Sequence, residues 1–321
     1  MQKTHGKNSL SLQTELREIH TPVSSPFPNF FIVGAAKAGT TSFAHYIGSH
    51  PDVFMSPIKE PHYFSSDIDS RALRIGSRSA AKYKSLFSGA AYARVIGEAS
   101  TTYLFSSVAA ERIYREAKHP RILILLRSPV ERAYSHFLMD MKMGIDMNRE
   151  YASELDFAAA VEADFHRDKK GWGISHLYVE LGQYAHQVKR YLNVFPPEQV
   201  KILFHDDYEN NLPEALDRVF RFLCLDPRLS TADLAGRLNS AQVPRYPSAH
   251  RVATAIGLQK AARLILSREA RSGIKRHYFR KPAPLSKKDF EQLLPYFRES
   301  TEELSQLLKR DLRNWLVAPS N

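Results

Sequence analysis

The feature that most constrains the fold is a short apolar run that leads through a glycine-bounded loop into a helical segment. Phe30–Val33 is apolar throughout and is closed by Gly34, a pattern typical of a buried strand. The loop Ala35–Gly39 follows, and Thr40–Ser49 has the pattern of a helix that ends before Pro51. A turn between a buried strand and a helix presents backbone N–H groups and the positive end of the helix dipole to solvent. The segment therefore predicts an anion-binding strand–loop–helix.

Strands and helices alternate along most of the chain. Apolar runs predict two further buried strands, at 121–126 and 200–204. Apolar spacing predicts helices at 177–192, 212–223, 286–294 and 296–308. This alternation is typical of a parallel sheet covered on both faces. The predicted fold class is therefore α/β, a single domain with a central parallel β-sheet flanked by helices and with a P-loop-like phosphate-binding strand–loop–helix.

Local signals refine this outline. Ser128 is placed to cap a helix that begins at Pro129, with Glu131 as its capping-box partner. The polar stretches 143–173 and 230–284 lack a regular apolar period, so we expect surface loops or lids there.

The ends of the chain differ in character from its middle. Residues 1–28 are polar, end in a Pro- and Ser-rich stretch and lack the apolar centre of a signal peptide, so we expect a flexible leader. One domain is expected over 29–316 and a tail over 317–321. No apolar run approaches the ~20 residues that a membrane span needs, and the expected location is the cytoplasm. The single cysteine, Cys224, ends an apolar helical segment and is expected to be buried; alone, it excludes a disulfide framework.

The net charge points to anionic partners. The chain carries a formal charge of +11 and has a pI near 9.6, which suits phosphate- or sulfate-bearing molecules, nucleic acid or anionic lipid. No Arg/Lys-rich run with interleaved aromatic residues occurs, and no zinc-finger spacing, so nucleic acid is disfavoured as a partner.

The composition of the first loop separates two kinds of phosphate site. Its Gly-x4-Gly spacing resembles the loop of nucleotide hydrolases, but Thr40 stands where those proteins carry lysine, and the lysine lies inside the loop as Lys37. The second strand ends in Arg127 rather than in a metal-binding aspartate. A site with these two cations and no acid suits an anionic donor handled without magnesium. The residues expected to bind the anion are Lys37, Ala38, Gly39, Thr40, Thr41 and Ser42.

Two other patterns carry candidate functional groups. Arg127 sits at a strand end, where α/β sheets bind ligands, and Ser135 follows it two turns into the next helix, so the pair is placed to grip a second phosphate. Glu60 and His62 alternate with apolar or aromatic neighbours in the segment 56–64, and a carboxylate and an imidazole this close are able to share proton transfer.

The order of these motifs resembles that of sulfotransferases that use 3′-phosphoadenosine 5′-phosphosulfate (PAPS), particularly the carbohydrate, heparan-type branch and its bacterial relatives. The resemblance spans roughly residues 29–316 and is closest at Arg127–His136. It implies that the Lys37 loop holds the 5′-phosphosulfate, that Arg127 and Ser135 hold the 3′-phosphate, and that Glu60 is the catalytic base with His62 beside it. It also implies adenosine 3′,5′-bisphosphate (PAP) as product and no metal.

The chain also departs from the heparan enzymes. Ala99 stands where they carry a lysine that reaches the acceptor, and their C-terminal disulfide loop is absent because Cys224 stands alone. Arg280 and Lys281 are the candidates for the C-terminal cofactor loop.

The expected reaction is an in-line transfer of a sulfuryl group to a hydroxyl or amine. Glu60 removes the acceptor's proton, and Lys37 neutralises charge on the departing phosphate oxygen. The expected partner is a small-molecule or glycan acceptor, with sugar, lipid and secondary-metabolite hydroxyls all open, and the sequence predicts no oligomeric state. The alternatives are a P-loop kinase or nucleotide hydrolase, a non-catalytic module that binds anionic glycans, and a basic nucleic-acid binder.

Overall fold

The structure is a computed structural model. It describes residues 26–68, 79–143, 156–167, 177–230, 242–246, 249–250, 252–253, 267, 270 and 277–319.

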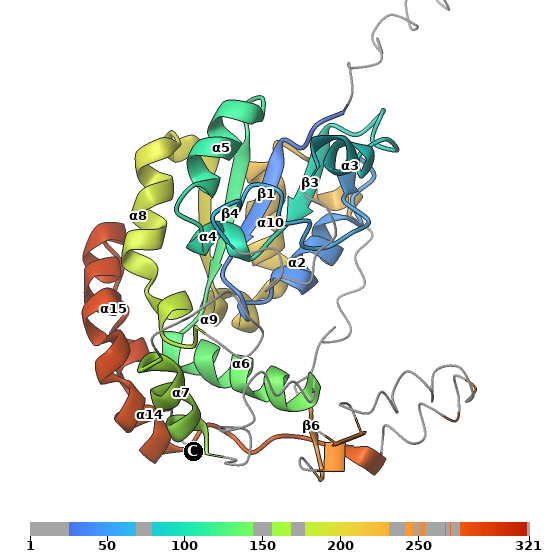
Figure 1. The fold of residues 1–321 in the computed structure, drawn as a ribbon. Coiled ribbons are helices and arrows are strands. Elements are labelled where there is room, and N and C mark those ends of the chain that lie inside the picture. The colour runs from blue at the N-terminus through green and yellow to red at the C-terminus, as the bar shows by residue number, and fades with distance from the viewer. Residues whose placement is uncertain are drawn as a thin grey trace, which may run out of the picture.

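A five-stranded, fully parallel sheet forms the centre of the molecule (Figure 1). Its strands lie in the order β2-β3-β1-β4-β5. They are β1 (Phe30–Gly34), β2 (Val53–Met55), β3 (Val95–Ala99), β4 (Arg121–Leu126) and β5 (Val200–Phe204). The strands β1, β3 and β4 are almost completely buried, as expected for a parallel sheet with helices on both faces. The predicted fold class is confirmed.

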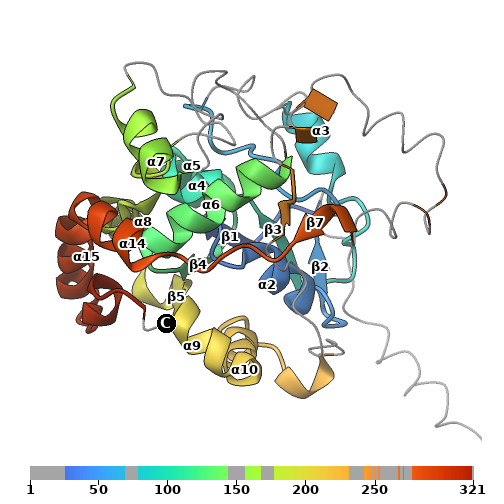
Figure 2. The same ribbon diagram turned by 90° about the horizontal axis from the view of Figure 1, so that it is seen from below.

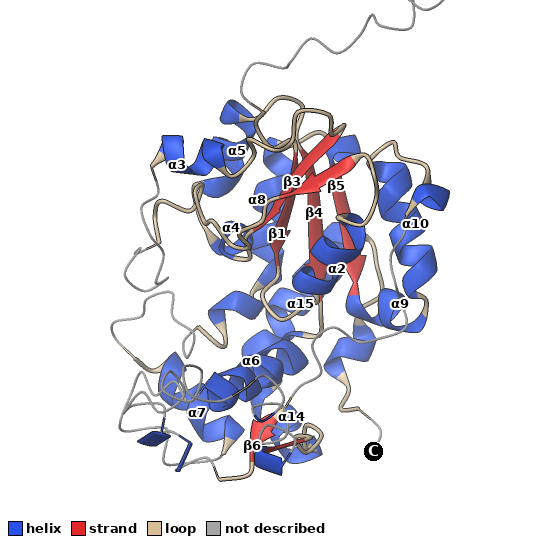
Figure 3. Ribbon diagram, turned by 90° about the vertical axis from the view of Figure 1, so that its right-hand side faces the viewer, coloured by secondary structure: helices blue, strands red, loops and turns tan. Residues whose placement is uncertain are grey.

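Helices cover the two faces of this sheet (Figure 3). On one face α2 (Thr40–Ile47) packs against α10 (Leu212–Phe222). On the other face α4 (Thr102–Phe105) and α5 (Ala109–Glu116) contact α8 (Tyr184–Val194), and α15 (Pro295–Leu308) lies outside α8. Shorter helices are α3 (Ala80–Ser85) and α9 (His205–Asn210), with 3-10 turns at Glu180–Gly182, Pro197–Gln199, Pro227–Leu229 and Arg313–Leu316.

A second, smaller cluster of elements lies beyond the carboxyl end of the sheet (Figure 1); Figure 2 views this end directly. It contains α6 (Pro129–Met143), which continues β4, with α7 (Phe157–Phe165), α14 (Lys287–Leu293) and the antiparallel pair β6 (Val243–Pro244) and β7 (Phe279–Arg280). These helices share an apolar core with the start of α15. The cluster therefore faces the loops that leave β1, β3 and β4.

Two helix predictions need correction. The helix expected over 177–192 is divided: Glu180–Gly182 form a 3-10 turn, and the α-helix begins only at Tyr184 because Gln183 has a non-helical backbone, at φ −79° and ψ 71°. The stretch 143–173 is not wholly irregular: α7 forms within it, capped by the Asp156 side chain, which accepts a hydrogen bond from Ala158 N–H. The rest of that stretch, and much of 230–284, lies outside the described residues.

The expected burial of Cys224 is wrong, because the residue is exposed. The helix α10 ends one residue before Leu223, and Cys224 adopts the left-handed conformation, with φ 57°. Cys224 N–H donates to Arg221 O at 3.0 Å and Leu225 N–H donates to Phe220 O at 2.9 Å, the two bonds of a Schellman motif. Leu225 takes the buried place instead.

Candidate active site

The candidate site lies where the chain reverses its order in the sheet. It leaves β1 toward β2, returns through β3, and then crosses to β4 on the other side of β1. Ligands of open α/β sheets bind at such a point, outside the carboxyl ends of the strands. The segments that meet there are the loop 35–39, the segment 56–65, the turn after β3 and the start of α6.

The loop 35–39 leaves the start of α2 open to a ligand. Its last residue, Gly39, is the N-cap of α2 at φ 82°, so no side chain caps the helix. The first N–H groups of a helix have no partner within it. The loop is held from behind by Tyr208 of α9, whose hydroxyl donates to Ala38 O; an added Cβ on Gly39 would lie 3.2 Å from that hydroxyl. The predicted anion-binding residues therefore form one continuous helix-start cradle.

Lys37 supplies a cation inside this loop. Its ammonium donates to the Met139 sulfur at 3.4 Å, and a thioether is a weak acceptor. Burial lowers the pKa of Lys37 to about 8; nearby Asp140 opposes this shift, while the charges of Arg132 and Arg127 add to it. An anion bound here would reverse the shift, so the loop gains both a charge partner and a strong acceptor when a phosphate or sulfate arrives.

The second predicted grip is only partly assembled. Arg127 follows β4, but its guanidinium donates to Glu131 Oε2 at 3.0 and 3.1 Å instead of facing Ser135, which is half-buried further along α6. The helix begins at Pro129 directly after Ser128, as predicted, but the capping box does not form: the buried Ser128 hydroxyl has no hydrogen-bond partner among the described residues, and Glu131 is bonded to Arg127. A buried hydroxyl with no partner beside an arginine fits a phosphate that arrives from outside.

Glu60 stands at the mouth of the site with its side chain 32% exposed. Its N–H donates to Ala99 O at 2.9 Å, which ties the segment to the end of β3. Its carboxylate accepts from Lys59 Nζ at 2.5 Å and from Thr101 Oγ1 at 3.3 Å. Burial raises the pKa of Glu60, but the hydrogen bond from His62 and the charge of Lys59 outweigh it and lower the pKa to about 2.

His62 lies behind Glu60 and is buried, with 4% of its surface exposed. Its Nε2 is 3.4 Å from Glu60 Oε2, and its Nδ1 is 2.7 Å from Thr102 Oγ1. Its backbone N–H donates to Ser100 Oγ at 3.1 Å. The predicted pairing of Glu60 with His62 is therefore present in the geometry, and α4 and the turn after β3 hold it.

The three predicted catalytic residues share a backbone peculiarity. Lys37, Glu60 and His62 all have positive φ, at 71°, 61° and 53°. A non-glycine residue in this region costs of the order of 1 kcal/mol and persists only where its surroundings hold it. The side chains are thus aimed by strained backbone, not by a regular helix or strand.

Two groups of polar residues near the site have no role in the sequence prediction. Glu98 is fully buried in β3 and accepts hydrogen bonds from Ser100 (2.8 Å), Tyr103 (2.9 Å) and Tyr83 (2.5 Å). Burial raises the pKa of Glu98 to about 7 against the lowering effect of these bonds. The sequence around Glu98 gives no sign that the hydroxyl groups of Tyr83, Ser100 and Tyr103 converge on it, because they meet only in the folded chain.

The other group lies on α6. The fully buried Arg132 donates to Tyr178 O at 2.5 Å, and Tyr178 donates through its hydroxyl to Asp140. His136 lies 3.9 Å from Asp140. In the sequence, the four-residue spacing of positions 132, 136 and 140 indicates that these side chains share one helix face.

The structure also describes residues that the sequence associates with the acceptor side and with the C-terminal cofactor loop. Ala99 is buried at the end of β3, and Arg280 is exposed on β7. Four aromatic residues, Tyr63, Tyr103, Trp172 and His176, are further candidates to line an acceptor pocket. Tyr103 is fully buried and Tyr63 stacks on Tyr83, whereas Trp172 and His176 lie outside the described residues.

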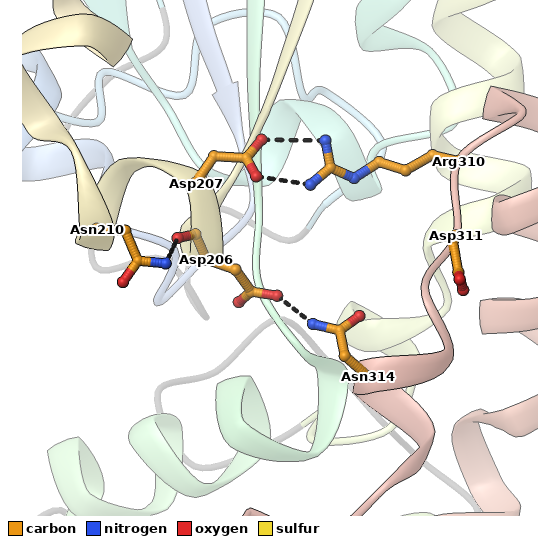
Figure 4. Close-up of a pocket in the computed structure, with 6 residues that line it drawn as sticks. All are labelled: Asp206, Asp207, Asn210, Arg310, Asp311 and Asn314. Carbon is orange, nitrogen blue, oxygen red and sulfur yellow. Dashed lines mark hydrogen bonds and ion pairs between the residues drawn. The ribbon is translucent and has the colours of Figure 1, made fainter.

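A cavity of about 400 Å³ lies elsewhere, between α9 and the C-terminal segment (Figure 4). Asp207 accepts two hydrogen bonds from Arg310, and Asp206 accepts from Asn314 at 2.6 Å. Both carboxylates of the cavity thus already bond to side chains of the C-terminal segment, and their negative charge would repel a phosphate or sulfate. An anionic ligand therefore fits the sheet edge better than this cavity.

Among the described residues, no three His, Cys, Asp or Glu side chains gather as a metal site would require. No helix in the described ranges is long and apolar enough to cross a bilayer.

Comparisons with known proteins agree with this geometry. The family model described as a sulfotransferase domain matches residues 27–235. The crystal structure of a sulfotransferase from Alicyclobacillus acidocaldarius superposes with a TM-score of 0.66 at 28% identity, covering 90% of this chain and 99% of that one.

Curated relatives match over shorter parts of the chain. Carbohydrate sulfotransferase 15 of Homo sapiens is 26% identical over 247 residues, which cover 62% of this chain and 44% of that protein. Heparan sulfate glucosamine 3-O-sulfotransferase 3B1 of Homo sapiens is 24% identical over 219 residues, covering 66% of this chain and 52% of that protein. The chain thus spans about half the length of the curated relatives it matches.

Proposed function

Because the chain belongs to the sulfotransferase family, as the match over residues 27–235 shows, we propose that it moves a sulfuryl group from PAPS to a carbohydrate or glycoconjugate acceptor. The observation that carries the proposal is the meeting of the Lys37 loop and the Glu60–His62 pair at one sheet edge. Ser100 N–H donates to Ile32 O at 3.1 Å, and Glu60 N–H donates to Ala99 O, so the base segment is tied to β3 and, through the turn after β3, to the strand that carries the loop.

Donor binding falls to the helix start and to two cations. The N–H groups of Thr40, Thr41 and Ser42 would receive the 5′-phosphosulfate together with Lys37. Arg127 would exchange Glu131 for the 3′-phosphate, with Ser135 beside it, and the partnerless Ser128 hydroxyl lies at the same helix start. This reading gives each of the two phosphate positions its own cation.

Transfer then needs a base and a stabiliser of the leaving group. Glu60 accepts the proton of the acceptor's hydroxyl or amine as that atom attacks sulfur, and Lys37 offsets the charge that builds on the departing phosphate oxygen. His62 holds Glu60 in place from behind. Each of these roles uses a side chain whose backbone is already fixed, so little rearrangement accompanies the reaction.

Two observations support the proposed class of acceptor: the names of the curated relatives, and the alanine at position 99. The names of the curated relatives refer to carbohydrate and to heparan sulfate glucosamine, which supports a glycan. Ala99 removes a cation from the acceptor side, which favours an acceptor less anionic than heparan. The location in the cytoplasm stays a prediction.

Two measurements test the proposal. A screen of neutral and anionic glycans with radiolabelled PAPS should yield labelled product without added magnesium. Calorimetry should show tighter binding of PAP than of AMP, because AMP lacks the 3′-phosphate. No transfer to any acceptor, with equal affinity for PAP and AMP, would refute it.

A further inference from the structure

A closed ring of hydrogen bonds surrounds the back of His62. Ser65 donates from its hydroxyl to His62 O at 3.2 Å and lies 2.9 Å from Thr102 Oγ1. Thr102 Oγ1 in turn lies 2.7 Å from His62 Nδ1. All three residues are buried, with exposed fractions of 0% for Ser65 and Thr102 and 4% for His62, so water has little access to the ring of bonds.

The direction of each bond follows from counting hydrogens. Ser65 has one hydroxyl hydrogen, and the carbonyl of His62 can only accept, so Ser65 must accept from Thr102. Thr102 then has no hydrogen left for the imidazole and must accept from it. Nδ1 of His62 therefore carries a hydrogen. The reverse arrangement would withdraw the Ser65 hydrogen from the buried His62 carbonyl, which is costly.

This assignment leaves Nε2 as the basic atom of the neutral ring, and Nε2 is the atom 3.4 Å from Glu60 Oε2. Besides His62, the charged group that faces Glu60 is Lys59, which contacts the other carboxylate oxygen. A protonated Nε2 donates to this carboxylate, and that hydrogen bond is the main cause that lowers the pKa of Glu60 to about 2, so a proton shared by the pair rests on the ring. A base at Nε2 gives that proton a place to go.

We propose that Thr102, with Ser65, is a positioning residue that locks His62 in the Nδ1–H form, so that Nε2 receives from Glu60 the proton released by the acceptor. In the transfer, the acceptor's O–H bond breaks and its proton joins Glu60. The acceptor oxygen bonds to sulfur, and the sulfur–oxygen bond to the 5′-phosphate breaks with its electrons on the phosphate. The proton then passes from Glu60 to Nε2, which leaves a carboxylate beside an imidazolium. The second step rests on the proposed function; the tautomer does not.

The tautomer is measured first, on the whole chain with 15N-labelled histidine. Two-bond nitrogen–proton correlation spectra of the neutral imidazole distinguish a protonated Nδ1 from a protonated Nε2, and a His62→Asn variant assigns the signal. We expect Nδ1–H in the wild type and a mixture of both forms in Thr102→Val. A wild-type ring protonated at Nε2 would overturn the proposal, whether or not the chain transfers sulfuryl groups.

Kinetics then test the consequence. Thr102→Val should lower kcat about tenfold, the equivalent of about 1.4 kcal/mol, without changing the KM for PAPS, and Thr102→Ser should restore it. Thr301→Val is the matched control, because Thr301 is also a buried threonine with a hydroxyl hydrogen bond, to Phe297 O at 2.8 Å, but lies in α15. An equal fall in kcat in both variants would reduce Thr102 to a packing role. If the wild type transfers no sulfuryl group at all, the proposed function fails while the spectrum still decides the tautomer.

Discussion

Two polar regions of this molecule differ in how completely their side chains are hydrogen-bonded to the rest of the protein. At the sheet edge, the described residues offer Lys37 only a thioether acceptor and Ser128 no partner, and Glu60 and His62 have strained backbone. In the C-terminal cavity, Asp206 and Asp207 are bonded to the Asn314 and Arg310 side chains (Figure 4). The open hollow of about 400 Å³ is at the C-terminal segment, yet the spare bonding capacity lies at the sheet edge. Unfilled donors, not hollow volume, identify the functional region here.

Residues with positive φ also differ between the active site and the rest of the molecule. Seven non-glycine residues of the described chain have positive φ, and Lys37, Glu60 and His62 are three of them. Cys224 and Lys309 are two others, and both stand at helix ends, where a left-handed residue closes the last turn. Positive φ at a helix end is ordinary architecture, whereas positive φ in the loops beside β1 and β3 aims reactive groups.

The sharpest test of the comparison replaces one carboxylate by an amide in the active site. Glu60→Gln should lower kcat by roughly 10²–10⁴, because the base is lost, while the melting temperature and PAP affinity stay near the wild-type values. Sulfuryl-transfer assays measure kcat, thermal denaturation measures the melting temperature, and calorimetry measures PAP affinity. A stable variant with wild-type turnover would remove Glu60 as the base and direct attention to His62.

Lys37→Ala should lower kcat by about 10²–10³ and weaken PAP binding less, since charge on the leaving phosphate grows toward the transition state. The pKa of about 8 adds a pH signature: as pH rises through 8 the ammonium loses its proton, so kcat/KM should fall. Lys37→Arg, which keeps its charge, should abolish that fall. Normal turnover of Lys37→Ala at saturating PAPS would leave Lys37 as a docking charge only.

Arg127→Ala should weaken PAP by about 1.5–3 kcal/mol, the range for hydrogen bonds to charged groups, and should change AMP binding far less. Calorimetry with the two nucleotides measures the difference. Equal losses for both would show that the salt bridge with Glu131 serves the fold and that the 3′-phosphate binds elsewhere.

The smallest effect is expected from the same chemical change in the other region. Asp207→Asn breaks the two-bond contact with Arg310, at 2.6 and 3.0 Å, and should cost about 1–2 kcal/mol of stability. Turnover and PAP affinity should stay unchanged. Denaturant unfolding beside the transfer assay gives a pattern opposite to that of Glu60→Gln; a drop in turnover without loss of stability would make the cavity part of the active region.

Sequence reasoning found three of the five strands, because apolar runs such as Arg121–Leu126 admit few other structures, and it missed the short β2 and β3, which contains Gly97 and Glu98. It reached Lys37, Glu60 and His62 through spacing and family resemblance, and the structure places Glu60 beside His62. It could not show the hydroxyls of Ser65 and Thr102 around His62, because residues 37 positions apart meet only after β3 and α4 have packed. The Arg127–Glu131 pair, four residues apart on one helix, was within reach of the sequence and was assigned to capping instead.

The helix α9 has a consequence for anyone who shortens or extends this protein. Within six residues it carries Tyr208, which holds the loop at Ala38, and Asp206 and Asp207, which hold the segment 310–315. The short helix α9 thus links the segment 310–315 to the phosphate loop. We expect a tag added after residue 321 to be tolerated, whereas a truncation before Arg310, which removes the contacts of Asp206 and Asp207 together, would release α9 and loosen the loop from a distance.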